Sequence, residues 1–516
     1  MAVVFLLFFR LDHRPFWQDE AETACLARNV LKYGVPQAFD GVNLISQEEG
    51  REFNRDYLWR WSPWLQVYLT AAAFALGGLD TTVGRLPFAV LGLGCVILVY
   101  FLVKRHFGDL AWARLAAAFL GFSVPFLLFS RQCRYYSVGA LLVLLSLYAF
   151  RQKWQSRWGP ALLLAVSLGL LFYTNYLIFF SYTAAFLLAA ILFYRREVLV
   201  FRSLVVLLVL GLMLVPGLAF YRIWEQTSMM DVLHVWISLN RYFGDLFQFV
   251  LSMPVAIALI WRWRRPEIPR DPKERFAIFL TLIISVNLSI LALIPYCEHR
   301  YLIHLYPLSA MLLGWVVCRL WSYQRFAAVL LGLLLMFTNW LHLVPLDWLR
   351  MTNRPLHNDI YMLTYPNIPI KLYLGELFSP YPDVNSNLIR FFQSFAQPGE
   401  TILTTYDDLP LQFYTPCKVI GGLQGEVLLG PEELPDWVVK RWYSRWNRDH
   451  KLISSEAFIL EKLKLEKDYQ AVVLPYEDEI FGNRADPFYH HFVPPVEPIN
   501  RITIYCKRSK VANHVQ

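Results

Sequence analysis

The hydropathy pattern divides the chain into a part with long apolar runs, from about residue 85 to residue 345, and a part without them. Most of these runs approach the ~20 apolar residues that an α-helix needs to cross a bilayer. Residues 1–11 are apolar but too short to span, so either the chain starts late or this segment is the tail of a first helix. The predicted spans are 85–103, 110–129, 137–151, 159–174, 176–194, 203–222, 245–262, 276–295, 302–320 and 326–345.

A second ambiguous apolar segment is residues 62–79, SPWLQVYLTAAAFALGGL. If it spans the membrane, the preceding loop 12–60 is cytoplasmic, and if it lies in the interface, that loop is external. The segment is rich in Ala and Gly, begins Ser-Pro-Trp and has no basic flank before Arg85, which favours an interfacial helix. The sequence therefore predicts an α-helical polytopic membrane protein with about 11 transmembrane helices and external juxtamembrane helices.

Basic residues gather in every second loop between the predicted spans. By the positive-inside rule these loops are cytoplasmic, which makes the remaining loops and the C-terminal part external. The basic loops are 104–105, 151–157, 195–202, 262–275 and 319–325. The external loops are 130–136, 174–176, 223–244 and 296–301. Of these, 223–244 is long enough to act as a mobile lid, although an ordinary connector explains it equally well.

The C-terminal part has the composition of a soluble domain. The predicted boundary lies near Leu346, which gives a membrane domain at 1–345 and an external α/β domain at 346–516. Runs rich in Val, Ile, Thr and Tyr predict strands at 401–405, 471–474 and 501–507, whereas 435–446 and 454–467 are typical of helices. Asp407 and Asp408 follow the first strand, where a turn is the simpler explanation and a binding or metal site the other.

Composition supports the membrane interpretation. Of 516 residues, 56% are hydrophobic and only 17% are charged, against about 25% in a typical soluble domain. The net charge of +8 would suit a nucleic-acid partner, but cytoplasmic loop charges explain it without one. We therefore expect membrane lipids, and no nucleic acid, as partners.

The most charged stretch near the predicted membrane boundary is loop 12–60, part of an external loop 12–84. Asp19 stands before an Ala-rich run, and Glu22 follows three residues later, as in a capping box. Gly34 and Pro36 then end the helix. In the simplest interpretation, Asp19 is a helix cap.

A functional interpretation of the same helix rests on its position outside a membrane. Residues spaced by three or four positions share one helix face, namely Glu20, Ala24, Arg28 and Leu31. An acidic pair at such a helix start, Asp19 and Glu20, can meet a lipid headgroup, and the helix N-terminus itself favours anions.

Two short external loops carry basic residues against the positive-inside trend. They contain Arg131, Arg134, Tyr135 and Tyr136 in the first loop, and Glu298, His299, Arg300 and Tyr301 in the second. External arginines need an anionic partner, either a lipid headgroup or a substrate phosphate, to which the planar guanidinium can bind two oxygens. His299 is either a hydrogen-bonding residue or, less simply, a metal ligand.

These residues together resemble glycosyltransferase family 39 of the GT-C superfamily, which uses polyprenyl-phosphate sugars and includes protein O-mannosyltransferases and lipid A aminoarabinose transferases. The resemblance covers roughly residues 12–320. It is carried by the pattern Asp19-Glu20, Ala24, Arg28, Leu31 and Gly34, by SPWLQVYLTAAAFALGG, by GRLPFAVLG at 84–92, by SRQCRYYS at 130–137, and by HRYLIHLYPLSAMLLG from His299.

The resemblance implies inverting sugar transfer from a polyprenyl-phosphate-linked donor to a hydroxyl acceptor of unknown identity. Asp19 would be the base and Glu20 would orient it or the acceptor, while the donor phosphate would be bound by Arg28, Arg131, Arg134 and Arg300. Further donor or acceptor contacts would come from Tyr135, Tyr136, Glu298, His299 and Tyr301. The resemblance places the protein in the plasma (inner) membrane, with the catalytic loop and the C-terminal domain on the periplasmic side.

The sequence also departs from the family pattern. Several members have a second acid in the second external loop, where this chain has Arg131 and Arg134 and no acid. No cofactor is required by the sequence, and dependence on a divalent metal stays open. The alternative functions are a polytopic transporter or flippase of lipid-linked glycans and a silent scaffold. Spans almost free of Asp, Glu and Lys argue against ion-coupled transport.

Overall fold

The structure is a computed structural model that describes residues 1–47, 50–152, 158–198, 201–226, 232–263, 271–294, 297–352, 354, 362–381, 383–421, 434–442, 454–479, 484–493 and 500–509. By its internal packing the chain forms two compact units. The first contains Met1–Phe9, Leu86–Gly375 and Ala485–Phe492, and the second contains Arg10–Arg85, Glu376–Arg484 and Val493–Gln516. The predicted division into a membrane domain, 1–345, and an external domain, 346–516, stays a prediction about membrane placement.

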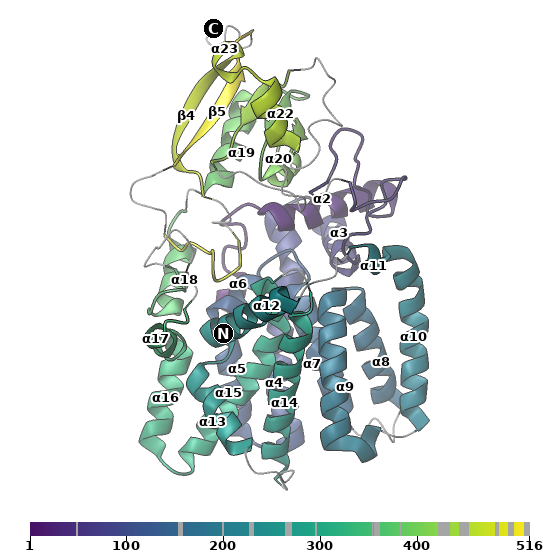
Figure 1. The fold of residues 1–516 in the computed structure, drawn as a ribbon, viewed down its shortest axis with the longest axis vertical. Helices are drawn as coiled ribbons and strands as arrows, with labels where there is room; N and C mark the ends of the chain where they lie inside the picture. The colour runs from purple at the N-terminus through teal and green to yellow at the C-terminus, as the bar shows by residue number, and fades with distance from the viewer. Residues whose placement is uncertain are drawn as a thin grey trace. The chain divides into compact units, whose positions relative to one another are not determined.

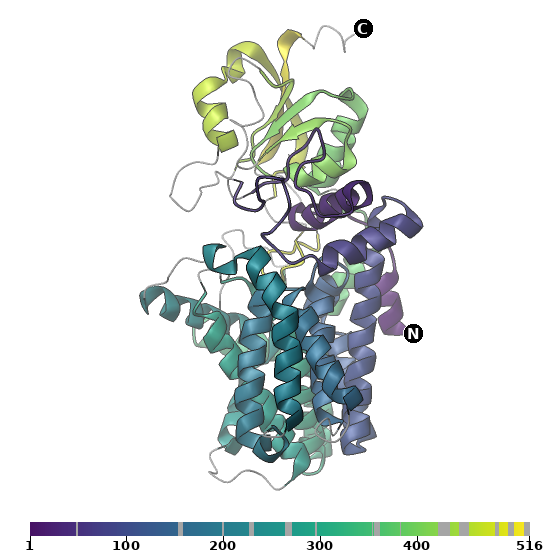
Figure 2. The ribbon, with the colours of Figure 1, turned by 90° about the vertical axis from the view of Figure 1, so that its right-hand side faces the viewer.

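The first unit is a helical bundle in which long apolar helices such as α4, α9, α10 and α14 run roughly parallel (Figures 1 and 2). Helix α4 begins in the second unit, and α18 ends in it. The helices are α1 (Ala2–Phe8), α4 (Thr81–Phe107), α5 (Leu110–Gly121), α6 (Val124–Ser130), α7 (Tyr136–Arg151), α8 (Trp158–Phe172), α9 (Tyr176–Val198), α10 (Phe201–Tyr221), α11 (Ile223–Gln226), α12 (Val232–Asp245), the π-helix η1 (Leu246–Val250), α13 (Met253–Trp263), α14 (Pro272–Leu291), the 3-10 helix η2 (His299–Leu305), α15 (Tyr306–Trp321), α16 (Arg325–Phe337), α17 (Trp340–Trp348) and α18 (Pro369–Phe378).

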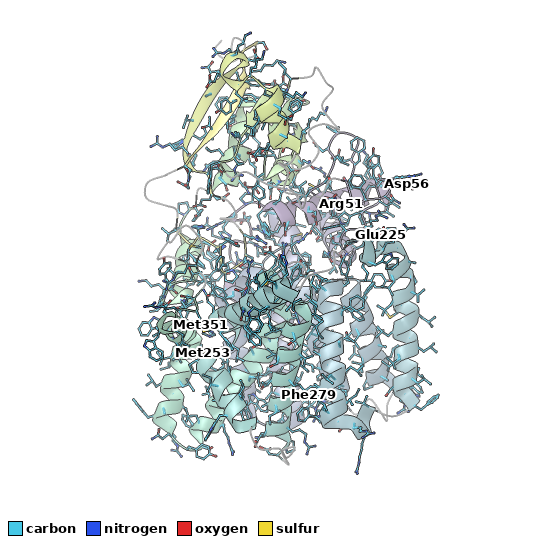
Figure 3. All side chains as sticks on the ribbon, viewed as in Figure 1. Arg51, Asp56, Glu225, Met253, Phe279 and Met351 are labelled. Carbon is cyan, nitrogen blue, oxygen red and sulfur yellow. The ribbon has the colours of Figure 1, made fainter. Side chains whose placement is uncertain are left out.

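Aromatic and aliphatic side chains fill the interior of this bundle. Phe279 of α14 is fully buried (Figure 3), and its ring lies 5.3 Å from that of Tyr194 and 6.1 Å from that of Phe150. Leucines on α10, by contrast, are largely exposed, for example Leu212 at 67%. A helix that presents leucines outward is expected to face lipid rather than water.

Five helices among the described residues are long and apolar enough to cross a membrane, and eight are if each bent pair counts as one span. Shorter apolar helices are α3 (Leu65–Gly77), α7 and α8. The polytopic helical fold class is thus confirmed, while the count of about 11 spans stays a prediction. Helix α3 has 13 residues, well below the ~20 that are needed to cross a bilayer. This length agrees with an interfacial helix.

Three predicted spans are wrong as single straight helices. The span 110–129 is bent by 65° between α5 and α6, and the span 326–345 by 88° between α16 and α17. The span 245–262 contains a bend of 105°, between η1 and α13. Pro125 and Pro254 lie at the start of the helix after a break, where the missing N–H leaves no interior hydrogen bond unmade. Hydropathy alone does not detect such breaks, because apolar side chains continue through them.

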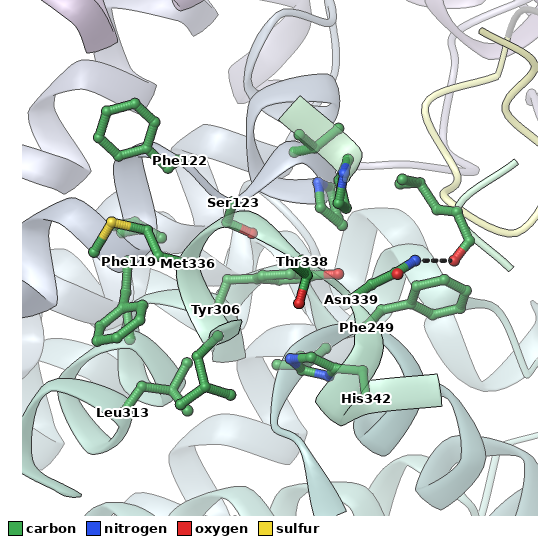
Figure 4. Close-up of a pocket in the computed structure, with 18 of the residues that line it drawn as sticks. Phe119, Phe122, Ser123, Phe249, Tyr306, Leu313, Met336, Thr338, Asn339 and His342 are labelled. Atoms are coloured by element: carbon green, nitrogen blue, oxygen red, sulfur yellow. Dashed lines mark hydrogen bonds between the residues drawn. The ribbon is translucent and has the colours of Figure 1, made fainter. Parts of the chain in front are cut away.

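All three breaks meet at one cavity within the first unit (Figure 4). Its lining includes Ser123 from the first break, Phe249 from the second, and Thr338 and Asn339 from the third. Asn339 stabilises the third break, because its side-chain amide donates to the carbonyls of Leu363 and Tyr365. Backbone groups freed by a broken helix are expected within the protein, at a cavity such as this one, rather than against lipid.

Much of the predicted loop 223–244 is helical, so an irregular connector is wrong here, while its external placement stays a prediction. Residues 227–231 lie outside the described residues, and α12 begins directly after them. Its exposed residues Leu233, Trp236 and Ile237 follow helical spacing, and the polar residues Asn240 and Arg241 lie on the next turn. The helical spacing of these residues is already present in the sequence.

The second unit contains a five-stranded mixed sheet with strand order β2-β1-β3-β5-β4. The strands are β1 (Thr401–Thr404), β2 (Lys418–Ile420), β3 (Trp437–Val439), β4 (Tyr469–Glu477) and β5 (Arg501–Lys507). Strand β1 pairs in parallel with β2 and β3, and β5 pairs antiparallel with β3 and β4. The helices of this unit are α2 (Gln18–Tyr33), α3, α19 (Val384–Phe395), α20 (Asp408–Tyr414), α22 (Ser454–Lys462) and α23 (Leu465–Asp468).

Alternate residues of β1 face opposite sides of the sheet, and both sides are covered. Ile402 packs in one core with Phe392 of α19, whereas Leu403 packs in another with Ile459 of α22. Both sheet faces are therefore buried, as in α/β domains. The strands predicted at 401–405, 471–474 and 501–507 are confirmed. The region 454–467 is helical as predicted, but it forms two helices, α22 and α23, instead of one.

The helix predicted at 435–446 is wrong. Residues 437–439 form β3, in register with β1 through Ile402 and Trp437, and 443–446 lie outside the described residues. Trp437 Nε1 donates to Glu400 Oε2 at 2.7 Å, which secures the strand. The sequence Trp-Val-Val favours a strand, and its burial between two neighbouring strands overrides the helical pattern of the flanking residues.

Candidate functional site

Helix α2 carries the acidic pair, and its N-cap is Trp17 rather than Asp19. The backbone N–H of Trp17 donates to Glu20 Oε2 at 3.5 Å, which makes Glu20 the reciprocal residue of the capping box. The prediction that Asp19 and Glu22 form the cap is therefore wrong, because Glu20 moves the helix start earlier. Asp19 lies partly exposed in the first turn, where the helix dipole stabilises its negative charge.

Glu20 forms a buried two-point ion pair with Arg85. Arg85 Nε donates to Glu20 Oε1 at 2.8 Å, and Nη2 donates to Oε2 at 2.6 Å. The same guanidinium donates to the backbone carbonyls of Leu11, Arg14 and Pro15. Glu20 thus uses both oxygens to bind Arg85, and this pair joins the segment before α2 to the helix itself.

No function is predicted for Arg85 from the sequence. The available signal was a single arginine at the start of a long apolar helix, within GRLPFAVLG. A buried guanidinium needs a carboxylate partner, but several acids of residues 12–84 could have supplied it. Only the tertiary structure identifies Glu20, and not Asp19, as that partner.

Arg28 is held within the second unit. Its Nη2 lies 3.0 Å from Asp40 Oδ2, and its Nη1 donates to the carbonyl of Gln412 at 3.1 Å. A quarter of the side chain stays exposed. Its predicted contact with a donor phosphate stays a prediction, and any phosphate would compete with Asp40.

Arg131 binds backbone carbonyls in the first unit. Its two terminal nitrogens donate to the carbonyls of Leu6, Leu7 and Phe9 at 2.9–3.2 Å. These carbonyls belong to the last turn of α1, which has no further helical N–H groups to satisfy them. The observed contacts thus give Arg131 a clear structural function as the cap of α1.

The two predicted basic loops converge in the first unit. Electrostatic interactions join Tyr135 to Arg134, Tyr136, Arg300 and Tyr301. Burial raises the pKa of the Tyr135 phenol, the neighbouring tyrosines add to the rise, and Arg300 and Arg134 oppose it. Within the described chain the Tyr135 hydroxyl has no hydrogen-bond partner. The structure therefore assembles two guanidiniums and three phenols into one cluster.

His299 lies at the edge of this region and is buried. Its Nε2 is 2.9 Å from the hydroxyl of Tyr306, and its ring stacks on Phe129 with centroids 6.0 Å apart. Glu298 precedes it as the N-cap residue of η2, without a side-chain capping bond. The hydrogen-bonding interpretation of His299 is observed, and the described residues contain no group of three His, Cys, Asp or Glu placed to hold a metal ion.

Asp407 and Asp408 make internal contacts in the second unit. Asp407 Oδ2 lies 2.7 Å from Arg441 Nη1, and Asp408 Oδ1 accepts from Gln18 Nε2 at 2.6 Å. Asp407 has φ +58°, which marks a tight turn after β1. The structure thus supports the turn interpretation of this acidic pair.

A family model described as dolichyl-phosphate-mannose-protein mannosyltransferase matches residues 62–220, from the segment before α3 to the end of α10. Two solved structures resemble the whole chain. They are ArnT from Cupriavidus metallidurans in the apo state, with 12% identity and a TM-score of 0.59, and the same protein bound to undecaprenyl phosphate, with 14% identity and a TM-score of 0.55. Both matches cover 98% of this chain and 96% of the other. No curated protein matches at a significant level.

At these identities the likeness to ArnT concerns the fold. The matched family model and this fold confirm the predicted resemblance to the GT-C superfamily of membrane glycosyltransferases. The family-model match begins after Asp19 and Glu20, so it carries no information on the acidic pair.

Proposed function

We propose that this chain, a multi-pass membrane protein with the GT-C fold, is an inverting glycosyltransferase that uses a polyprenyl-phosphate-linked sugar. The family model names a lipid-phosphate mannose enzyme, and the ArnT structure of the same fold was solved with undecaprenyl phosphate. The acceptor is a hydroxyl group on a lipid, a glycan or a protein. We place the reaction on the external face of the membrane, on the basis of the loop charges.

In the proposed reaction, Asp19 takes the proton of the acceptor hydroxyl. The acceptor oxygen then forms a bond to the anomeric carbon from the face opposite the phosphate. The bond between that carbon and the phosphate oxygen breaks, and the polyprenyl phosphate leaves with the electron pair. One displacement of this kind inverts the anomeric configuration, and it needs one base and positive charge at the leaving phosphate.

The observation that carries the proposal is the different burial of the two acidic residues, Asp19 and Glu20. Glu20 is 0% exposed and holds Arg85 through both oxygens, so it is unsuited to receive a proton from an external hydroxyl. Asp19 is partly exposed, one residue away. The buried pair would fix the start of α2 and thereby orient Asp19, which gives Glu20 its predicted orienting function.

For the donor phosphate we propose Arg134 and Arg300. Arg131 and Arg28 also stay candidates; in the structure the first binds three carbonyls and the second binds Asp40 and Gln412. Arg134 and Arg300 share a cluster with phenolic hydroxyls, which can donate further hydrogen bonds to phosphate oxygens. Their two charges would stabilise the dianion that forms as the phosphate leaves.

The activity can be tested with the full chain in nanodiscs. The substrate would be undecaprenyl phosphate carrying a radiolabelled hexose, with total membrane lipid, cell-envelope glycan or protein supplied in turn as the acceptor. We expect label to move to one acceptor with inverted linkage and free undecaprenyl phosphate to accumulate. Label that stays on the donor with every acceptor would contradict the proposal.

The bent helices favour a second candidate, a transporter or flippase of lipid-linked glycans. Broken spans that meet at a cavity are a feature of many transporters. A liposome assay with a fluorescent lipid-linked sugar separates the two functions. Translocation without transfer would support the flippase, and transfer without translocation would support the enzyme.

A further inference from the structure

A cleft of about 760 Å³ opens in the first unit. Of the site residues predicted from the sequence, His299 lines it and the others do not. It is lined by the polar end of α12, by the segment after α17 that contains Met351 (labelled in Figure 3), and by residues 486–489. This volume lies in the range of small-molecule sites. With His299 of η2, four segments distant in the sequence therefore form one polar site.

Asp245 is the central group of this cleft. Its side chain is 6% exposed, yet within the described residues its carboxylate accepts no hydrogen bond, and its nearest ionisable partner is His299 Nδ1 at 3.9 Å. That distance is too long for a hydrogen bond. Buried carboxylates are normally satisfied by donors. The carboxylate of Asp245 therefore has unused acceptor capacity that faces the cleft.

Two side chains with hydrogen-bond donors stand beside it. Arg241 and Asn240 line the same cleft, and neither side chain has a hydrogen bond or ion pair among the described residues. Arg241 interacts electrostatically with Asp245 and with Glu298, but no carboxylate oxygen of the residues that the structure describes lies within 4.0 Å of its guanidinium. The cleft thus offers both acceptors and donors to a ligand.

The charges in the cleft select a neutral ligand. Asp486, a second carboxylate of the lining, is close enough to Asp245 for the two to repel each other. Arg354 also lines the cleft, but its Nη2 lies 2.7 Å from Asp347, so its charge is already balanced. An anion such as a phosphate would therefore meet the carboxyl groups of Asp245 and Asp486, and a cation would meet Arg241.

Two aromatic side chains complete the lining. The rings of Phe488 and Tyr489 are perpendicular, at 81°, with centroids 4.9 Å apart. They provide flat apolar surfaces beside the hydrogen-bonding groups. A pyranose ring has this combination of features, with C–H groups on its faces and hydroxyls, which donate and accept, around its edge.

We propose that this cleft binds one neutral sugar ring, with Asp245 and Asp486 accepting from its hydroxyls and Arg241 and Asn240 donating to them. The choice of a sugar as ligand rests on the proposed function, in which a sugar is both carried by the donor and, for a glycan acceptor, present on the acceptor. The sugar in the cleft comes from either source, and the experiment below distinguishes them.

The test is a binding measurement that does not depend on turnover. The full chain in nanodiscs, free of glycoside detergents, is titrated with the methyl pyranosides of glucose, mannose, galactose and xylose in saturation-transfer NMR. We expect transfer to the ring protons of at least one pyranoside. Loss of an ionic hydrogen-bond partner should weaken its affinity at least tenfold in Asp245→Asn and in Arg241→Gln. The second variant alters an exposed side chain and so guards against misfolding of the first.

Asp271→Asn is the matched control, because Asp271 caps α14 outside the cleft and Asn also caps helices well. It should bind as the unmodified chain does. Absence of transfer from every pyranoside, or equal affinity in Asp245→Asn, Arg241→Gln and the unmodified chain, would overturn the inference. The NMR experiment measures binding of the pyranoside and not turnover. An absence of binding is therefore distinguishable from an absence of sugar transfer.

A competition arm identifies the source of the sugar. If undecaprenyl-phosphate-glucose displaces the pyranoside and undecaprenyl phosphate alone does not, the cleft holds the donor sugar. If neither lipid displaces it, the cleft holds the acceptor sugar. Displacement by undecaprenyl phosphate alone would show an anion site and contradict the charge argument.

Discussion

Arg85 and Glu20 meet through two parallel hydrogen bonds, of 2.8 and 2.6 Å, with both side chains almost completely buried. The pair connects the first turn of α4 with the first turn of α2, two elements that the sequence separates by more than 40 residues. In the proposed reaction, this pair removes Glu20 as a catalytic base and leaves Asp19.

Replacing Asp19 with Asn should reduce sugar transfer by roughly 10²–10⁴-fold, since a positioned general base contributes about that much. Asn keeps the size of the side chain, so the melting temperature and the affinity for the lipid donor should stay unchanged. Transfer is measured as label released from the donor. Asp12→Asn, at an exposed position in the segment before α2, is the control. Near-normal turnover in Asp19→Asn would remove Asp19 from the mechanism.

Replacing Arg85 with Met should destabilise the fold. It leaves the Glu20 carboxylate buried without its partner, which costs about 3–5 kcal/mol in comparable cases. Thermal unfolding in nanodiscs is the measurement. The same exchange at Lys104, exposed near the other end of α4, should leave the melting temperature nearly unchanged. Equal melting temperatures of the two variants would show that the ion pair of Arg85 and Glu20 contributes little to stability.

Arg300 and Arg131 should differ in what they affect. Arg300→Gln is expected to raise the KM for the lipid donor about tenfold or more, because a charged phosphate contact is lost. Arg131→Gln should lower the melting temperature instead, because the carbonyls at the end of α1 lose a guanidinium that donates to three of them. An unchanged donor KM in Arg300→Gln would reject its phosphate function.

Glu479 should make stability depend on pH. Burial raises its pKa to about 7, against the opposing influence of the Tyr381 hydroxyl and Arg14. The folded state then holds a proton that the unfolded chain releases near pH 4.5, so this stabilising contribution is complete below that pH. It is lost as pH rises toward 7 and does not change further above it.

Glu479→Gln removes this titration and should flatten the melting temperature between pH 4.5 and 7. Glu461→Gln, at an exposed site on α22 of the same unit, is the control and should keep the slope. A slope that persists unchanged in Glu479→Gln would assign it to another group.

The sequence determined the class of the molecule and the types of its elements. Apolar runs of near-spanning length leave little choice but helices in a bilayer, because every backbone group must be satisfied within the segment. Strands β1, β4 and β5 were predicted from side chains that favour a pleated surface. The sequence also selected Asp19 and Glu20, and the two basic loops that the structure brings into one cluster.

Only the tertiary structure decided how those residues divide their functions. Burial of Arg85 required a carboxylate, and packing selected Glu20, because it faces inward while Asp19 remains partly exposed. The breaks in three apolar spans, the strand at 437–439 and the cleft around Asp245 depend on contacts between distant segments. Local composition cannot encode these features, since a partner many residues away supplies the energy that fixes each of them.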